Sequence, residues 1–167
     1  MTAEQTNDQA EYSGRFDRVR AAMETAGMDY LLIGPSTDMV YLINFGVRQS
    51  ERMTILVIPR EGTPRIVLPS FELDRIANLP QLFEPAPWAD GDDPAPVLAS
   101  LLGDNGSGAT VGVGGQLFTH FFMRIQNAAP QARFVSGDDV MEPVRQRKSP
   151  HEVAALRAAS EAADAVF

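Results

Sequence analysis

The sequence predicts an α/β domain of three layers, in which helices cover both faces of a mixed sheet. Two strand-length hydrophobic segments, residues 53–58 and 65–68, flank a loop rich in turn-forming residues, as in a β-hairpin. Later in the chain, strand-length apolar segments alternate with helix-length segments, which is typical of parallel strands joined by helices. A sheet that contains both a hairpin and such crossovers has strands of both directions, and is therefore mixed.

Periodicity and end signals define the other elements. Residues 12–27 carry apolar side chains at helical spacing and end at Gly27, where a C-terminal capping glycine is common. Asp93 and Pro94 are typical of a helix start, and this helix is expected to reach Leu102. Further strands are expected at residues 30–33, 39–43, 110–113 and 133–135, further helices at 70–78 and 116–128, and an extended connection at 80–96.

Composition indicates one globular domain and excludes several kinds of chemistry. The 167 residues are 44% hydrophobic and 22% charged, which is ordinary for a chain that folds around its own core. The chain has no cysteine, so thiol catalysis and cysteine-bound zinc are excluded. The longest apolar run, residues 55–58, is far shorter than the roughly 20 residues that span a bilayer, so no membrane partner is expected.

Charge argues against nucleic acid as a partner. The net charge is −8, and residues 76–123 contain no lysine or arginine. Such a surface repels phosphate groups, so binding to nucleic acid is not expected. Residues 1–11 are polar and lack the basic and apolar regions of a secretory signal, so we expect a flexible N-terminus and a cytoplasmic protein.

Few residues suggest chemistry within the chain. Its two histidines, His120 and His151, are expected to be structural or solvated, and none of the common hydrolase or nucleotide-hydrolysing motifs occurs. The glycines of residues 112–115 are expected to form a tight turn between a strand and a helix. Leu117 stands where a dinucleotide-binding loop has its third glycine, so nucleotide binding is not expected.

Two pairs of adjacent aspartates, at residues 92–93 and 138–139, resemble paired metal ligands. Both precede expected helix starts, where acidic side chains interact favourably with the helix dipole. Ser136 and Asp139 also approximate a capping box. Without a histidine or a third acidic group at fixed spacing, we assign neither a metal site nor a catalytic residue to this chain.

Residues 149–152, Ser-Pro-His-Glu, form a strong helix-start signal. Ser149 can accept a hydrogen bond from the N3 amide, Glu152 can reach back to the cap, and Pro150 suits the first helical position. Together with the preceding Arg-Gln-Arg-Lys, this segment resembles the linker of creatinases, prolidases and Xaa-Pro aminopeptidases, which joins an N-terminal domain to a catalytic "pita-bread" domain. Upstream segments also occur in the family's order: the opening helix and residues 29–32, 39–45, 55–69 and 88–90.

The resemblance implies a fold and a division of the chain. The N-terminal domain of the family has a ribonuclease-H-like fold without nuclease chemistry, which agrees with the mixed sheet expected above. Residues 1–11 are then a flexible N-terminus, 12–144 the N-terminal domain, and 145–167 the linker and first helix that lead to a catalytic domain.

The resemblance also implies where the metals belong. In the family the catalytic domain binds two divalent ions, Mn, Co or Zn, through two aspartates, a histidine and two glutamates. None of that region follows Phe167. This chain alone is therefore expected to hold no cofactor and to be catalytically silent, although the parent protein is expected to be an enzyme.

The helix that begins at Pro150 is expected to run to the end of the chain. Its apolar stripe lacks the domain against which it normally leans, so we expect the helix to fray or to pack against another copy. The stripe consists of Val153, Leu156, Ala159, Ala163 and Val166.

The loop of residues 44–52 is the candidate functional segment. In the dimeric enzymes of the family, the matching region can face the catalytic pocket, often across the dimer interface, and limit substrate length. Phe45 could form an apolar wall, and Arg48 or Arg52 could bind a substrate carboxylate through two hydrogen bonds. The alternative is an ordinary surface loop whose arginines pair with Glu51 or Glu61.

Three functions remain open. The first is the non-catalytic N-terminal domain of a metal-dependent Xaa-Pro dipeptidase or aminopeptidase, which contributes to homodimerisation and to gating of a small peptide substrate. The second is a catalytically silent module of the same fold that binds peptides or proteins, which the acidic segment of residues 84–104 motivates. The third is the N-terminal domain of a creatinase-type amidinohydrolase, which this domain does not distinguish from the first.

Overall fold

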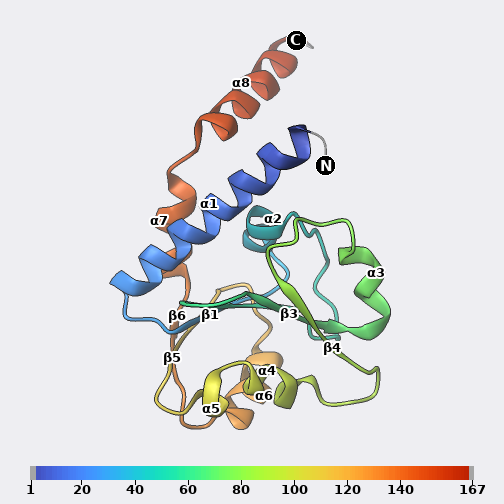
Figure 1. Cartoon of the computed structure of the whole chain (residues 1–167), viewed down its shortest axis with the longest axis vertical. Helices are drawn as coiled ribbons and strands as arrows, with labels where there is room; N and C mark the ends of the chain where they lie inside the picture. Colours follow the sequence, from blue (N-terminus) through green and yellow to red (C-terminus); the bar gives the residue numbers. More distant parts are fainter. Residues whose placement is uncertain (1–2, 166–167) are drawn as a thin grey trace.

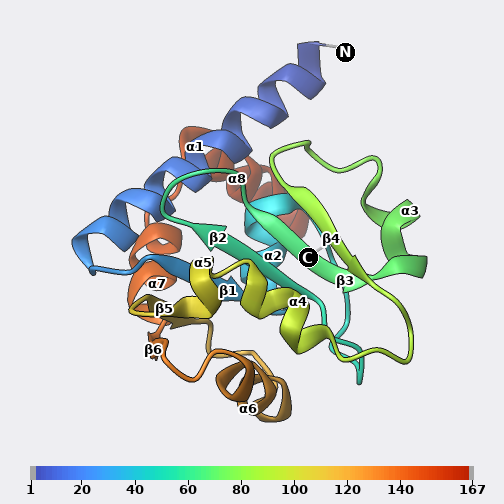
Figure 2. The ribbon, with the colours of Figure 1, turned by 60° about the horizontal axis from the view of Figure 1, so that its bottom comes forward.

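A mixed six-stranded sheet forms the centre of the computed structural model, which describes residues 3–165. The strand order is β4-β3-β2-β1-β5-β6 (Figure 2). β1 pairs in parallel with β5, β5 with β6, and β3 with β4, whereas β2 runs antiparallel to both β1 and β3. The strands are Tyr30–Ile33 (β1), Ile55–Pro59 (β2), Arg65–Pro69 (β3), Glu84–Trp88 (β4), Thr110–Val113 (β5) and Arg133–Ser136 (β6).

Helices cover both faces of this sheet (Figure 1). One face carries α1, α2 and α7, the opposite face carries α4, α5 and α6, and α3 lies beside the β3 and β4 edge. The last helix, α8, begins near the middle of α1, where Glu152 meets Arg15, and extends away from the sheet. The helices are Ala3–Thr25 (α1), Thr37–Ile43 (α2), Leu73–Ile76 (α3, preceded by the 3₁₀ turn Ser70–Glu72), Pro94–Ser100 (α4), Gly103–Gly106 (α5), Thr119–Ala128 (α6), Asp138–Gln146 (α7) and Pro150–Asp164 (α8).

The hydrophobic core has two halves, one on each face of the sheet. Successive side chains of a strand point to opposite faces. In β1, Leu31 and Ile33 therefore pack with the layer of α1, α2 and α7, while Leu32 packs with the layer of α4 and α6. The residues of β2 divide between the two halves in the same way. The three-layer α/β/α class predicted from the sequence is confirmed.

The strand expected at residues 39–43 is wrong, because this segment belongs to α2. Ser36 caps the helix by accepting a hydrogen bond from the amide of Met39 at 3.4 Å, and Asn44 ends it in the left-handed conformation with φ 55°. The buried side chains are Met39, Leu42 and Ile43, at helical spacing. Short apolar runs fit both periods, and here the serine cap decides for a helix.

The extended connection expected at residues 80–96 contains a strand instead. β4 runs parallel to β3 at the edge of the sheet, with Pro85 opposite Ile66 and Pro87 opposite Leu68. Proline cannot donate a backbone hydrogen bond, which favours the prediction of a loop. At a sheet edge that donor is not needed, so the prolines are tolerated and block further pairing.

The two predicted capping boxes have different outcomes. In α8 the box is present: Ser149 Oγ accepts from the amide of Glu152 at 3.2 Å, and the Glu152 carboxylate accepts from the amide of Ser149 at 2.8 Å. In α7 the box is wrong, since the N-cap is Gly137 and makes no side-chain capping bond. Asp138 instead accepts a hydrogen bond from the amide of Gly115 at 2.9 Å, which a local pattern cannot reveal.

Helix boundaries differ from the predictions at three points. α1 begins at Ala3, so the described part of the segment expected to be flexible is its first turns, and its flexibility stays a prediction. Met1 and Thr2 lie outside the described residues. α6 begins at Thr119, three residues later than predicted, and α4 ends at Ser100.

Candidate functional site

The carboxyl ends of five strands lie at one edge of the sheet. Because only β2 is antiparallel to its neighbours, the loops after β1, β3, β4, β5 and β6 all emerge there, and β2 begins there. The chain leaves β1 toward β2 on one side and later reaches β5 on the other side. Such a switch point at the carboxyl edge is the preferred place for ligand sites in open α/β sheets. The loop of residues 44–52, which joins α2 to β2, lies at this edge.

Gln49 connects the loop of residues 44–52 by hydrogen bonds to the segments that follow β1 and β5. Its side-chain amide donates to the carbonyl of Pro35, after β1, at 3.3 Å, and to the carbonyl of Gln116, after β5. A shallow pocket lies here, lined by Pro35, Gln49 and residues 115–119. The loop is thereby held over the junction between β1 and β5.

Arg52 is engaged by neighbouring side chains. Its Nε and Nη2 donate to the two carboxylate oxygens of Asp90 at 3.0 and 3.3 Å, and Nη1 pairs with Glu51. The guanidinium carbon lies 5.5 Å from the centroid of the Phe71 ring. The hydrogen bond that Arg52 donates to the Asp90 carboxylate raises the pKa of Arg52 above its ordinary value. Arg52 therefore stays charged, but its charge is already balanced.

Two phenylalanines near the loop differ in exposure. Phe45 is only 4% exposed and packs in the core, with the Arg75 guanidinium 5.3 Å from its ring centroid. Phe71, directly after β3, is 58% exposed. In this structure Phe71, rather than Phe45, offers an aromatic surface at the carboxyl edge. An aromatic residue just after a strand end is the sequence signal that could have identified it.

Arg48 is the exposed cation of the loop. Its side chain makes no ion pair or hydrogen bond with any side chain or backbone group of residues 9–165, whereas Arg52 is paired. The surface-loop alternative holds for Arg52, which pairs with Glu51 as that alternative expects. Of the two arginines proposed from the sequence, Arg48 therefore remains the candidate for an incoming carboxylate.

The acidic segment of residues 84–104 is largely neutralised in the fold. Arginines from flanking elements pair with three of its carboxylates: Arg65 with Glu84 at 2.9 Å, Arg52 with Asp90 at 3.0 Å, and Arg124 with Asp93 at 2.6 Å. Asp93 Oδ1 also accepts from the amide of Ala95, and so caps α4 as predicted. The acidic segment motivated a peptide- or protein-binding module, and these ion pairs leave that segment with less unpaired charge than its sequence indicates.

The described residues show no metal centre. Among the side chains that the structure describes, those of residues 9–165, no three histidine, cysteine, aspartate or glutamate groups come together in a way that could hold an ion. Both histidines are exposed, and the His120 ring lies 3.9 Å from the Phe121 centroid. None of the described helices combines the length and apolar character needed to cross a bilayer.

Comparison with known proteins identifies the family. A family model described as the creatinase/prolidase N-terminal domain matches residues 15–147. The chain belongs to this family. The probable dipeptidase PepE of Mycobacterium tuberculosis and that of Mycobacterium bovis are each 32% identical to it over 158 residues. These matches cover 93% of this chain and 41% of the relatives.

Solved structures of this family superpose on the chain. The crystal structure of dipeptidase PepE from Mycobacterium ulcerans has a TM-score of 0.81 and 34% identity, over 89% of this chain and 40% of that protein. The dipeptidase from Pyrococcus horikoshii has a TM-score of 0.78 and 25% identity, over 92% and 42%. This creatinase/prolidase N-terminal domain thus spans about two fifths of the length of these relatives.

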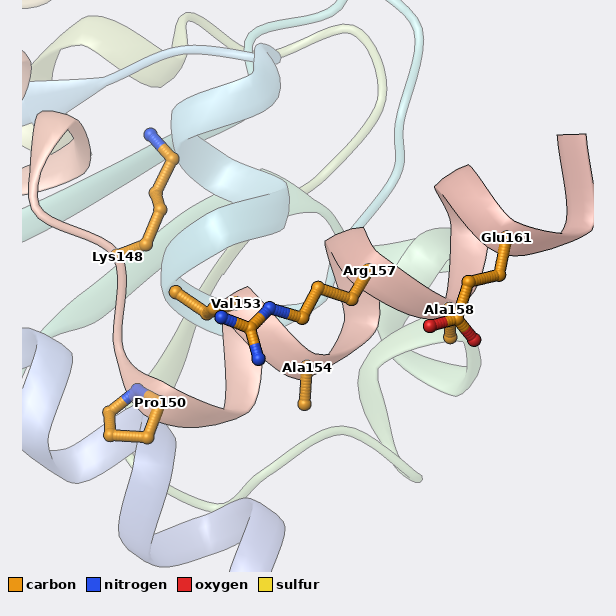
Figure 3. A pocket seen from close by; sticks show the side chains of 7 residues that line it. All are labelled: Lys148, Pro150, Val153, Ala154, Arg157, Ala158 and Glu161. Carbon is orange, nitrogen blue, oxygen red and sulfur yellow. The ribbon is translucent and has the colours of Figure 1, made fainter. Parts of the chain in front are cut away.

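Helix α8 of this creatinase/prolidase N-terminal domain presents an uncovered face. Every described residue from Val153 to Ala165 is exposed, including Leu156 at 57%. Figure 3 shows the groove beside α8, lined by Lys148, Pro150, Val153, Ala154, Arg157, Ala158 and Glu161. Val166 of the predicted apolar stripe lies outside the described residues. The predicted fraying or self-association of α8 stays a prediction.

Proposed function

We propose that this chain is the non-catalytic N-terminal domain of a cytoplasmic, dimeric, metal-dependent dipeptidase that cleaves the bond before proline. Family membership and the dipeptidase relatives support this proposal. The chain's span of about two fifths of those relatives fits a division of labour with a separate catalytic part. The uncovered face of α8 is where that part would pack.

The domain's own contribution would be substrate gating at the carboxyl edge. The observation that carries this is the contrast between Arg48, which is exposed and has no ion pair within residues 9–165, and Arg52, which pairs with Asp90. A guanidinium can bind a peptide carboxylate through two charge-assisted hydrogen bonds. The exposed ring of Phe71 would supply an apolar surface beside it. Together these groups would favour short peptides with a free carboxyl end.

The metals of the reaction would be held outside the described residues. The proposed dipeptidase needs two divalent ions, Mn, Co or Zn, and the described side chains of residues 9–165 bring no suitable ligands together. No step of the reaction is therefore assigned to this chain. We expect the isolated chain with Mn²⁺ to hydrolyse no Xaa-Pro dipeptide, and measurable metal-dependent hydrolysis would overturn the division of labour.

The gating role is tested in the full-length protein with two matched substrates. Arg48→Ala should lower kcat/KM for an Xaa-Pro dipeptide about tenfold or more, because a hydrogen bond to a charged group contributes roughly 1.5–3 kcal/mol. The C-terminal amide of the same dipeptide lacks the carboxylate and should be unaffected. Arg133→Ala, at an exposed position on β6, is the control. Equal loss for both substrates, or no loss for either, contradicts the role of Arg48.

The alternatives make different predictions in the same experiments. A creatinase-type amidinohydrolase would hydrolyse creatine rather than Xaa-Pro dipeptides. A peptide- or protein-binding module would hydrolyse neither, and its acidic surface is weakened by the three arginine pairs described above. Sedimentation velocity of the full-length protein tests the proposed homodimer, and a monomer at all concentrations would count against it.

A further inference from the structure

The linker is fastened to the domain at two points, and both involve helix α2. At the start of the linker, in the last turn of α7, Arg145 Nη1 lies 2.6 Å from Asp38 Oδ1 and 3.1 Å from Thr37 Oγ1, both in the first turn of α2. After it, the Glu152 carboxylate lies 3.3 Å from Arg15 Nη2, and Arg15 Nη1 donates to the carbonyl of Tyr41 in α2 at 2.6 Å. The two contacts bracket α2.

Arg15 is held from several sides. Its side chain is 11% exposed, and its guanidinium carbon lies 4.8 Å from the Tyr12 ring centroid and 4.4 Å from that of Tyr41. Glu11 Oε1 lies 3.4 Å from its Nε. A planar guanidinium with rings against it and carboxylates around it has little freedom to move. Arg15 is therefore held rigidly, and its Nη2 offers a fixed contact to the Glu152 carboxylate.

Glu152 links the rigidly held Arg15 to the first turn of helix α8. One of its carboxylate oxygens accepts from the amide of Ser149 and completes the capping box, while the other accepts from Arg15. The side chain is 18% exposed, so the pair is partly shielded from water. Beyond Glu152 the described residues of α8 are exposed. The Arg15 contact therefore supplies the main restraint on the direction in which α8 leaves the domain.

The same helix α2 leads into the loop of residues 44–52. α2 has only seven residues, and Asn44 directly after Ile43 turns the chain into the loop. Arg18, one turn after Arg15, holds the hydroxyl of Tyr41 at 3.1 Å. We propose that Arg15 is a positioning residue that fixes the direction of α8 relative to the domain. Because Arg15 also contacts α2, it couples the direction of α8 to the position of α2 and the loop of residues 44–52. This inference rests on the proposed function and deepens it, since Arg15 would fix the position of the gating loop relative to the catalytic part.

The test measures geometry in the 167-residue chain. The chain has no cysteine, so Gln126→Cys on α6 and Ala154→Cys, on the side of α8 opposite Glu152, give two unique spin-label sites. In the chain that carries only these two cysteines, the distance between the labels should have one narrow distribution. In Arg15→Met and Glu152→Gln it should widen by about 5 Å, on the order of one helical turn. Glutamine at residue 152 can still complete the capping box, so that variant removes the Arg15 pair alone.

The control is Arg20→Met on the same helix, because Arg20 donates to the Gly62 carbonyl, away from the linker. Its distribution should match that of the unsubstituted chain. Amide exchange gives a second readout: Val40 and Asn44, whose amides bond to Ser36 and Val40 carbonyls, should exchange about threefold faster in Glu152→Gln. An unchanged distance distribution and unchanged exchange in Glu152→Gln would overturn the proposal. Neither readout depends on hydrolase activity. A failure of the proposed dipeptidase function can therefore be distinguished from a failure of the proposed role of Arg15.

Discussion

Arg52 and Asp90 lie side chain to side chain at the carboxyl edge, with Nε and Nη2 of the arginine 3.0 and 3.3 Å from the two carboxylate oxygens. They come from the two ends of a long segment that includes β2, β3 and β4. Their pairing gives the two arginines of the loop different roles. Arg52 helps to hold the loop and the Phe71 ring, while Arg48 faces solvent.

Arginine-selective labelling should distinguish these two residues. Phenylglyoxal reacts with the unprotonated guanidine, and Asp90 raises the pKa of Arg52, so less of that form exists at any given pH. Arg48 should therefore be modified faster than Arg52. Asp90→Ala lowers the Arg52 pKa toward its ordinary value and should bring its rate close to that of Arg48. Peptide mass spectrometry measures both rates, with Asp92→Ala as the control. Equal rates in the unsubstituted chain would contradict the pairing.

Two glycines should respond in opposite directions to alanine. A Cβ atom at Gly137 would lie 2.6 Å from Leu31 Cδ1 and 2.9 Å from the backbone carbon of Val113. The backbone cannot give way cheaply, so Gly137→Ala should destabilise the fold by about 1–3 kcal/mol. Gly46, in the 44–52 loop, has no heavy atom within 4 Å of such a Cβ, and Gly46→Ala should stabilise by about 0.4–1 kcal/mol. Urea unfolding of both variants checks the two signs, and a loss at Gly46 would contradict the open geometry.

Local chemistry was predictable from the sequence at the start of α8, where one segment contains all the partners. The cap of α8 involves only Ser149 and Glu152, three residues apart, and forms as expected. The layer structure followed from periodicity, because strands buried on both faces must lie between two layers of helices. The helix α2 was missed because a short apolar segment fits both periods, and its signal was the serine cap rather than the pattern.

The candidate site was less predictable, because its contacts join distant segments. Phe45 and Phe71 both follow apolar runs, yet Phe45 is buried in the core with Arg75 of α3 beside its ring, whereas Phe71 is exposed. The acidic segment looked like one surface in the sequence. Three of its five carboxylates pair with Arg65, Arg52 and Arg124, which the register of β3 and β4 and the position of α6 bring to it. Pairings of this kind depend on topology, which residue patterns alone do not specify.

The side-chain hydrogen bond of Trp88 should stabilise the fold in addition to the packing of its ring. Its Nε1 donates to the carbonyl of Met53 at 3.0 Å, and both residues are buried. Trp88→Phe keeps the aromatic packing but leaves this carbonyl without its donor, which should cost about 1–3 kcal/mol. Urea unfolding followed by far-UV circular dichroism is the measurement, since Trp88 is the only tryptophan of the chain. Phe118→Leu, at a ring that is 38% exposed, should change the midpoint little.

Helix α8 should depend on its first turn more than on any other contact. Because its described residues beyond Glu152 are exposed, tertiary packing cannot replace a lost cap. Ser149→Ala should destabilise the helix by about 0.5–2 kcal/mol, whereas Ser160→Ala, at an exposed position in the helix interior, should slightly stabilise it. Amide exchange by NMR should show slower exchange in residues 152–156 than in residues 158–165 of the unsubstituted chain. Uniform strong protection of residues 158–165 in a monomer would mean that α8 has a partner within the chain, and would contradict this view of an uncovered helix.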